Sequence, residues 1–165
     1  MASEHIAIVP AIEKDVPAIL CFIRKLAEYE HLSHEVAASE ESLRRHLFGP
    51  RPAAEVLLAR IAAQPVGFAL FFQTFSTFLA APGIWLEDLF VLPEYRRRGV
   101  GRALLRQVAS IAIRRSCGRL EWSVLNWNES AIRFYQTIGA MAMADWHMQR
   151  LTGAALARLG EKPTT

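Results

Sequence analysis

Cysteine is scarce in this sequence, and three kinds of pattern are missing from it. Its 165 residues include only Cys21 and Cys117, too few for a disulfide framework, and reduced thiols are typical of cytoplasmic proteins. Residues 1–5 show no cationic region before an apolar run, so we expect no secretory signal. The five histidines do not cluster with cysteines or carboxylates, so we expect no metal site.

Charge is missing from one long stretch, between Arg60 and Glu87. Prolines, glycines and polar residues interrupt this stretch and would be costly in lipid, so we expect no membrane span there. Two buried strands joined by a polar loop fit it better. With 52% hydrophobic and 21% charged residues, and no internal repeat or linker, the sequence predicts one globular domain over residues 1–165.

Acidic residues are absent from residues 96–119, which carry eight arginines. Residues 28–41 show the reverse, with five glutamates and neither lysine nor arginine. This asymmetry suits an anionic cofactor and a cationic substrate, although the acidic run equally fits a solvated helix face. The basic run lacks the interleaved aromatic residues of a base-stacking platform, so we expect no nucleic-acid partner.

Two glycines stand one residue apart after a hydrophobic segment. Residues 85–92 predict a buried strand, Pro93 a turn, and Gly99 and Gly101 the start of a helix. The glycines permit backbone angles that let successive N–H groups converge on an anion, and the helix dipole favours negative charge there. The segment therefore predicts a phosphate site. Guanidinium donors are expected from Arg96, Arg97, Arg98 and Arg102.

Two common phosphate loops do not fit these residues. A Walker loop needs lysine followed by serine or threonine after its second glycine, where Arg102 and Ala103 stand. A Rossmann loop has a third glycine where Leu104 stands here. An ordinary strand-turn-helix with a solvated, arginine-rich loop remains the alternative.

Hydrophobic periodicity predicts strands interspersed with helices along the chain. Gly118 is expected to end the third helix in a left-handed conformation, and Gly139 to end the fourth. The expected helices cover residues 14–28, 39–47, 101–115 and 128–138, with a short one after Thr152. Cys21 is expected among the packed residues of the first helix, and the third is expected to bury Leu104, Val108, Ile111 and Ala112. Ser39 is expected to cap the second helix, and either Asn126 or Asn128 the fourth. The expected strands cover residues 5–9, 55–61, 66–75, 84–92, 120–125, 140–144 and 146–151.

Residues 96–101 have the form Arg/Gln-x-x-Gly-x-Gly/Ala, and here the sequence resembles the GNAT superfamily of N-acetyltransferases. Residues 24–30, 86–88 and 126–135 further resemble the diamine and thialysine N-acetyltransferases. The resemblance covers residues 5–150. It implies an α/β (α+β) fold, with a mixed, mostly antiparallel sheet of about six to seven strands flanked by helices. It also implies a central parallel strand pair splayed for the cofactor, acetyl-CoA as cofactor with coenzyme A as product, and a homodimer.

The same resemblance implies roles for individual residues. Tyr135 would protonate the leaving thiolate; without the resemblance, its spacing with Ile132 and Ile138 would indicate a core residue. Glu87 is the candidate base, acting directly or through water, or else a carboxylate that only binds substrate. Cofactor contacts are expected at Leu89, Phe90, Val91, Arg96, Arg97, Arg98, Gly99, Val100, Gly101, Arg102, Asn128 and Tyr135. Substrate contacts are expected at Tyr29, Glu30, Ser76, Phe78, Glu87 and Asp88.

Adjacent strand residues point to opposite faces, so we expect only one of Glu87 and Asp88 in the cleft. Backbone N–H groups of Leu89 and Val91 are expected to bind the thioester oxygen and pantetheine amides. Asn128 is expected to bind the cofactor arm, to cap its own helix, or both.

The predicted function is acetyl transfer from acetyl-CoA to the primary amine of a small cationic substrate. An alkylamine is neutral in about one molecule in 2,500 at pH 7, so a base near it is useful. Ser76 stands where the diamine enzymes have an aspartate, which favours a thialysine- or lysine-like amine over a di- or polyamine. The alternatives are an acceptor that is a protein or an aminoglycoside, and a non-catalytic acyl-CoA-binding sensor on the same fold.

Overall fold

The chain divides into two compact units, residues 1–123 and residues 124–165. Its structure is a computed structural model that describes residues 5–161. The first unit carries the β-sheet, and the second carries two short helices. The single domain expected over residues 1–165 stays a prediction.

A mixed five-stranded sheet organises the first unit, with strand order β1-β2-β3-β4-β5. Neighbours from β1 to β4 pair antiparallel and β4 pairs parallel with β5, which confirms the mostly antiparallel sheet. The parallel contact involves only Gly83, Ile84 and Trp85 of β4, as expected for a splayed pair. The strands are β1 (Ile6–Pro10), β2 (Glu55–Ile61), β3 (Gln64–Ser76), β4 (Ala81–Val91) and β5 (Arg119–Glu121).

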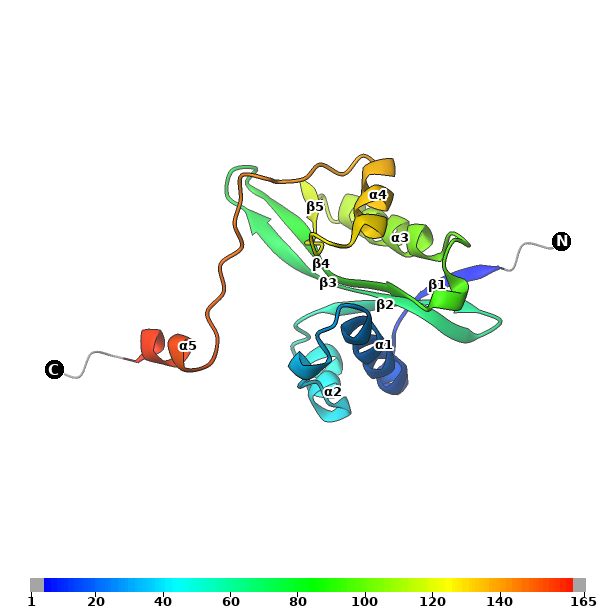
Figure 1. Ribbon diagram of the computed structural model, residues 1–165, viewed down its shortest axis with the longest axis horizontal. Helices are drawn as coiled ribbons and strands as arrows, with labels where there is room; N and C mark the ends of the chain where they lie inside the picture. The colour runs from blue at the N-terminus through cyan, green and yellow to red at the C-terminus, as the bar shows by residue number, and fades with distance from the viewer. Residues whose placement is uncertain (1–4, 162–165) are drawn as a thin grey trace. The chain divides into compact units, whose positions relative to one another are not determined.

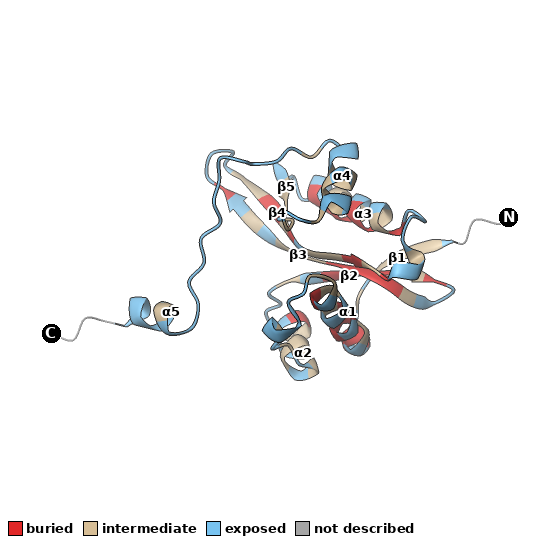
Figure 2. Cartoon of the chain, in the orientation of Figure 1, coloured by how far each residue is buried: buried red, intermediate tan, exposed pale blue. Residues whose placement is uncertain are grey.

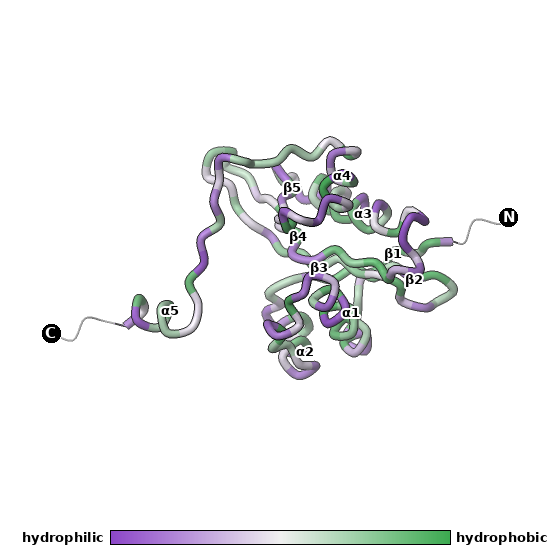
Figure 3. Tube along the Cα trace, in the orientation of Figure 1, coloured by the Kyte–Doolittle hydropathy of each residue, from purple (hydrophilic) through white to green (hydrophobic). Residues whose placement is uncertain are grey.

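Helices cover both faces of this sheet. α1 (Val16–Tyr29) and α2 (Glu40–Phe48) lie on one face, and α3 (Val100–Arg114) lies on the other (Figure 1). Hydrophobic stretches run along the central strands (Figure 3), as expected for a sheet that is covered on both sides. A 3₁₀ turn (Pro93–Tyr95) separates β4 from the loop that begins α3.

Three aromatic rings fix β4 against α1. Buried residues follow the middle of the sheet and the helix faces that meet it (Figure 2). Phe22 of α1 stacks on Phe68 of β3 with ring centroids 5.6 Å apart, and lies 6.2 Å from Phe90 of β4. Burying one such side chain contributes about 1.5–3 kcal/mol, so the end of β4 is firmly placed.

The helix patterns were largely read correctly. All four α3 residues expected in the core are buried: Leu104, Val108, Ile111 and Ala112. On α2, Ser39 and Ser42 cap the helix reciprocally, with N–H to Oγ distances of 3.1 and 3.0 Å. Two details were wrong. Cys21, expected among the packed residues of α1, is exposed, and Ser116 (φ +54°) rather than Gly118 takes the left-handed position after α3.

The second unit contains α4 (Glu129–Thr137) and α5 (Gly153–Gly160). Asn128 caps α4 by accepting a hydrogen bond from the N–H of Ala131 at 3.2 Å, and Gly139 (φ +85°) follows it, as expected. The short helix after Thr152 is likewise confirmed.

The sheet is smaller than expected. The strands predicted over residues 140–144 and 146–151 do not form in the described structure, and the strand predicted over 120–125 is reduced to β5. The prediction of six to seven strands was therefore too high. A strand needs a paired neighbour, and apolar alternation in the sequence does not supply one. Met141, Met143, Trp146 and Met148 are accordingly exposed.

No helix among residues 5–161 combines the length and apolar character needed to cross a bilayer.

The turn between β2 and β3 offers a test of backbone strain. Ala62 and Ala63 form its two-residue loop with φ +47° and +68°, where a side chain is disfavoured. We expect Ala63→Gly to raise the free energy of unfolding by about 0.5–1 kcal/mol. The measurement is urea unfolding, with Ala37→Gly as control because the φ of that exposed loop residue is not positive. An equal gain in both variants would contradict the strain argument.

Candidate active site

A β-bulge interrupts β4 at Glu87. Leu86 pairs with Phe71 of β3 and Asp88 pairs with Leu70, which leaves Glu87 without an opposite residue. A bulge changes which face of a strand the following side chains occupy. The strict alternation expected for Glu87 and Asp88 is therefore lost.

The bulge brings both carboxylates together. Paired residues share a face, and Leu70 packs against the core beneath α1 and α2, so Asp88 lies on that face too. The indole N–H of Trp85 donates to Glu87 Oε2 at 2.9 Å, and the charge of Glu87 acts on Asp88. The prediction that only one of the two could face the cleft was wrong, because it assumed a regular strand.

A third carboxylate joins them from α1. Burial raises the pKa of Asp88 to about 7, with further contributions from the negative charges of Glu87 and Glu30. Burial also raises the pKa of Glu30, which follows the last residue of α1. Three neighbouring acidic groups suit an ammonium ligand, and a carboxyl that titrates near neutrality suits proton transfer.

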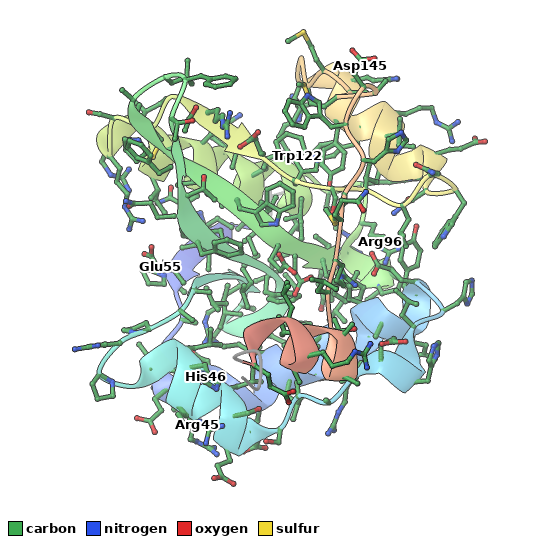
Figure 4. The ribbon with its side chains drawn as sticks, turned by 90° about the vertical axis from the view of Figure 1, so that its left-hand side faces the viewer. Arg45, His46, Glu55, Arg96, Trp122 and Asp145 are labelled. Atoms are coloured by element: carbon green, nitrogen blue, oxygen red, sulfur yellow. The ribbon has the colours of Figure 1, made fainter. Side chains whose placement is uncertain are left out.

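Tyr29, the last residue of α1, directly precedes Glu30 of this acidic group. The guanidinium carbon of Arg96 stands 4.8 Å from the centre of the Tyr29 ring and 5.6 Å from that of Phe90. Figure 4 shows Arg96 near the end of α1. The structure therefore brings four predicted substrate residues of the first unit together: Tyr29, Glu30, Glu87 and Asp88.

The predicted phosphate loop precedes α3. Gly99 adopts φ +83° as the N-cap of α3, and no side chain caps that helix end. Arg97 is also left-handed, at φ +62°. Successive N–H groups in such a turn form an anion-binding concavity at the positive end of the helix dipole. Arg98 stacks over Tyr95 at 5.2 Å, and the side chains of Arg97 and Arg102 are exposed.

The two loop glycines are expected to respond differently to one added methyl group. No atom lies within 4 Å of a Cβ built on Gly99, so only its backbone conformation requires glycine. We expect Gly99→Ala to cost about 1–2 kcal/mol of stability and to weaken acetyl-CoA binding. Gly101 is helical and a Cβ there meets only Val91, so Gly101→Ala is the control and should gain up to about 1 kcal/mol. Chemical unfolding and calorimetric titration measure both effects; equal losses in the two variants would contradict the loop geometry.

One edge of β4 is left open within the first unit. β5 pairs with β4 no further than Trp85. The N–H of Leu92 donates to Val66 on β3, so alternation directs the N–H groups of Leu89 and Val91 to the other edge, away from β3. This geometry supports the expectation that these two amides bind the cofactor.

Ser76 and Phe78 are not brought to the carboxylates within one chain. Ser76 pairs with Ala81 at the far end of the β3–β4 hairpin, about 20 Å along the strand from Leu70 and its partner Asp88. Ser76 is buried, and its hydroxyl accepts the N–H of Leu79 at 3.3 Å, which closes the loop. Phe78 is 96% exposed at the tip. Their predicted contact with the same substrate group as Asp88 is therefore not supported within a single chain.

Two predicted residues belong to the second unit. Asn128 uses its side-chain oxygen as the α4 cap, which confirms one of its two expected roles. Tyr135 is half-exposed on α4, with its ring 5.4 Å from that of Phe134. None of the α4 residues is buried, so Tyr135 is not a core residue of this helix. Its role in thiolate protonation stays a prediction.

Sequence reasoning missed two partners of the site. Trp85 donates to Glu87, a contact that the sequence analysis did not identify; the available signal was its position two residues away on one strand, which places both side chains on one face. Arg96 was expected only at the phosphate, and no sequence signal linked it to Tyr29. Among the described residues, no group of three or more His, Cys, Asp or Glu side chains is arranged to hold a metal.

The first unit thus combines a left-handed glycine turn at the start of α3, an open edge of β4 and three neighbouring carboxylates, an arrangement that an acyl-transfer enzyme could use. The acetyltransferase (GNAT) family model matches residues 23–140, and the chain belongs to this family. It is therefore an acetyl-CoA-dependent acetyltransferase.

Curated relatives match nearly the whole chain. Thialysine N-epsilon-acetyltransferase of Sus scrofa is 39% identical over 163 residues, covering 92% of this chain and 95% of its own length. L-ornithine N5-acetyltransferase of Arabidopsis thaliana is 34% identical, with coverage of 88% and 84%.

Solved structures agree with this fold. An integron cassette protein from the mobile metagenome of V. cholerae superposes with a TM-score of 0.80 at 26% identity, covering 95% of this chain and 98% of its own. An aminoglycoside acetyltransferase from an uncultured soil metagenomic sample superposes at 0.71 with 17% identity, which shows the fold alone.

Proposed function

We propose that this enzyme transfers the acetyl group of acetyl-CoA to the primary amine of a small, lysine-like cation, by direct attack within a ternary complex. The acidic group formed by Glu30, Glu87 and Asp88 carries this proposal. Three clustered carboxylates attract an ammonium ion, and the Tyr29 ring beside them provides a face for its alkyl chain.

Proton removal is proposed for the Glu87–Asp88 pair. The amine must lose a proton before it attacks, and that step accounts for about 4–5 kcal/mol at pH 7. A general base works best when its pKa lies near the operating pH, and the pKa of Asp88 is raised to about 7. Trp85 holds Glu87 beside it, so that the pair can share the charge of the incoming ammonium group.

Acetyl-CoA supplies a reactive thioester. We propose that its phosphates bind at the Gly99 turn and the N-terminus of α3, with charge from Arg97, Arg98 and Arg102. The amides of Leu89 and Val91 on the open edge of β4 would bind the pantetheine arm and the thioester oxygen. Tyr135 is proposed to protonate the departing thiolate.

The names of the relatives support the class of acceptor. Thialysine and ornithine are both amino acids with a terminal side-chain amine, and enzymes named for them share 39% and 34% identity with this chain.

We also propose that the enzyme is a cytoplasmic homodimer. Its two cysteines are unpaired, as is usual in a reducing compartment. Exposed apolar residues such as Met141 and Trp146 of the second unit, and Phe78 of the hairpin tip, are candidates for burial against a second chain.

Initial-velocity kinetics test the proposed reaction. Thiol release is measured while acetyl-CoA and lysine or thialysine are varied together. Direct attack predicts intersecting double-reciprocal lines, and parallel lines would indicate an acetyl-enzyme instead. Saturable acetyl-CoA binding without turnover on any amine would favour the non-catalytic sensor.

A further inference from the structure

The side chain of Arg96 touches both halves of the proposed site. Its Nε donates to the backbone oxygen of Val91 at 3.0 Å. Its guanidinium carbon lies 4.8 Å from the centre of the Tyr29 ring, on α1. One side chain therefore links the end of β4 to the end of α1, although the two segments are far apart in sequence.

The hydrogen bond to Val91 falls on the edge of β4 proposed for the cofactor. The N–H of Leu92 points to Val66 on β3, so the N–H and C=O of Val91 point the opposite way. By holding that carbonyl, Arg96 restrains the peptide group that follows Val91 and, through it, the end of the strand that presents the Leu89 and Val91 amides.

The contact with Tyr29 falls on the side proposed for the amine. Tyr29 immediately precedes Glu30, one of the three carboxylates. A guanidinium over a tyrosine ring contributes about 0.5–1 kcal/mol at exposed sites, and arginine stays charged at all working pH values. Arg96 therefore fixes the ring against which the acceptor chain would lie.

We propose that Arg96 is a positioning residue that couples the two substrates, holding the cofactor edge of β4 and the amine-side ring of Tyr29 in one arrangement. This inference rests on the proposed amine and acetyl-CoA sites. It differs from a direct phosphate contact, because its effect appears in amine affinity and in the influence of one ligand on the other.

The test is a double-mutant cycle of Arg96→Ala and Tyr29→Leu. Calorimetry measures the Kd of lysine with and without saturating coenzyme A, and the Kd of coenzyme A at several salt concentrations. We expect each single variant to raise the lysine Kd and KM about five-fold, with kcat changed less than about two-fold, and the double variant to add little more. Loss of the Val91 hydrogen bond should raise the coenzyme A Kd by less than about three-fold, and the salt dependence of that Kd should stay that of the wild type, because no phosphate contact is lost.

Arg98→Ala is the matched control, because Arg98 belongs to the same loop but stacks on Tyr95. We expect it to weaken coenzyme A in a salt-dependent manner and to leave the lysine Kd unchanged. Arg96→Lys, which keeps the charge but loses the planar stack, should recover only part of the amine affinity. Unfolding curves of all variants report whether stability alone has changed.

Three outcomes overturn the inference. If Arg96→Ala weakens the binding of coenzyme A and reduces the salt dependence of that binding, Arg96 is a phosphate ligand instead. If the effects of Arg96→Ala and Tyr29→Leu on the lysine Kd multiply in the double variant, the two residues act independently. If Arg96→Ala leaves the lysine Kd unchanged, Arg96 does not act on the amine site. The proposed function is tested separately by turnover. If the double-mutant cycle gives the expected Kd values but the wild type acetylates no amine, the proposed reaction is rejected and the positioning role of Arg96 is retained.

Discussion

Asp88→Asn is expected to lower kcat/KM for a lysine-like amine by about 100-fold near pH 7. The substitution keeps the size of the side chain and removes both its charge and its capacity to accept a proton. Since the pKa of Asp88 is raised to about 7, the wild-type rate should fall on the acid side of that pH, and the variant should lose this limb of the profile.

The same substitution is expected to stabilise the protein at high pH. The folded-state pKa of Asp88 lies above its unfolded value, so its contribution to stability is fully present below the unfolded pKa. That contribution is lost as the pH rises through the folded value near 7. Asp88→Asn removes this dependence, and the free energy of unfolding at pH 8 should rise by about 2–4 kcal/mol relative to the wild type.

Glu87→Gln separates the two carboxylates. Removing the negative charge of Glu87 lowers the pKa of Asp88, so the acid limb of the rate profile should move to lower pH. Within the proposed pair we expect Asp88 to accept the proton, and a greater loss of rate in Glu87→Gln than in Asp88→Asn would contradict this and make Glu87 the base. Coupled carboxylates titrate as a pair, so the comparison must use both variants over the whole pH range.

Tyr135→Phe is expected to lower turnover about ten-fold or more, with little change in the Kd of acetyl-CoA. The hydroxyl is proposed to protonate the thiolate, a group that exists only as the thioester bond breaks. Its loss should therefore affect kcat more than ground-state binding. Stopped-flow thiol release and calorimetric titration measure the two quantities.

Tyr95→Phe is the control for Tyr135→Phe. It makes the same chemical change at a half-exposed tyrosine under Arg98, outside the proposed chemistry. Unchanged turnover in Tyr135→Phe, or equal losses in both variants, would end the proposed role of Tyr135.

Much of the first unit follows from local sequence signals. Gly99 and Gly101 after a hydrophobic strand predicted the loop and α3, and the Ser39 cap predicted α2, because each depends on neighbouring residues. The strands expected over residues 140–151 depended on a partner that the sequence does not specify, and they do not form in the described structure.

The site shows the same division. Glu87 and Asp88 were identified as candidates by resemblance, but the bulge that gathers them arises from the register between β3 and β4. Likewise, Arg96 meets Tyr29 only because α1 packs beneath β4. Contacts between distant segments decide such features, and a single sequence does not show them.

Thiol release against a panel of amines tests the central claim most directly. The panel holds thialysine, lysine, ornithine, putrescine, spermidine and an aminoglycoside, each with saturating acetyl-CoA. The proposal of a lysine-like acceptor predicts the highest kcat/KM for one of the first three, about ten-fold or more above spermidine and the aminoglycoside. A preference for the aminoglycoside, or no turnover on any amine despite acetyl-CoA binding, would contradict this account.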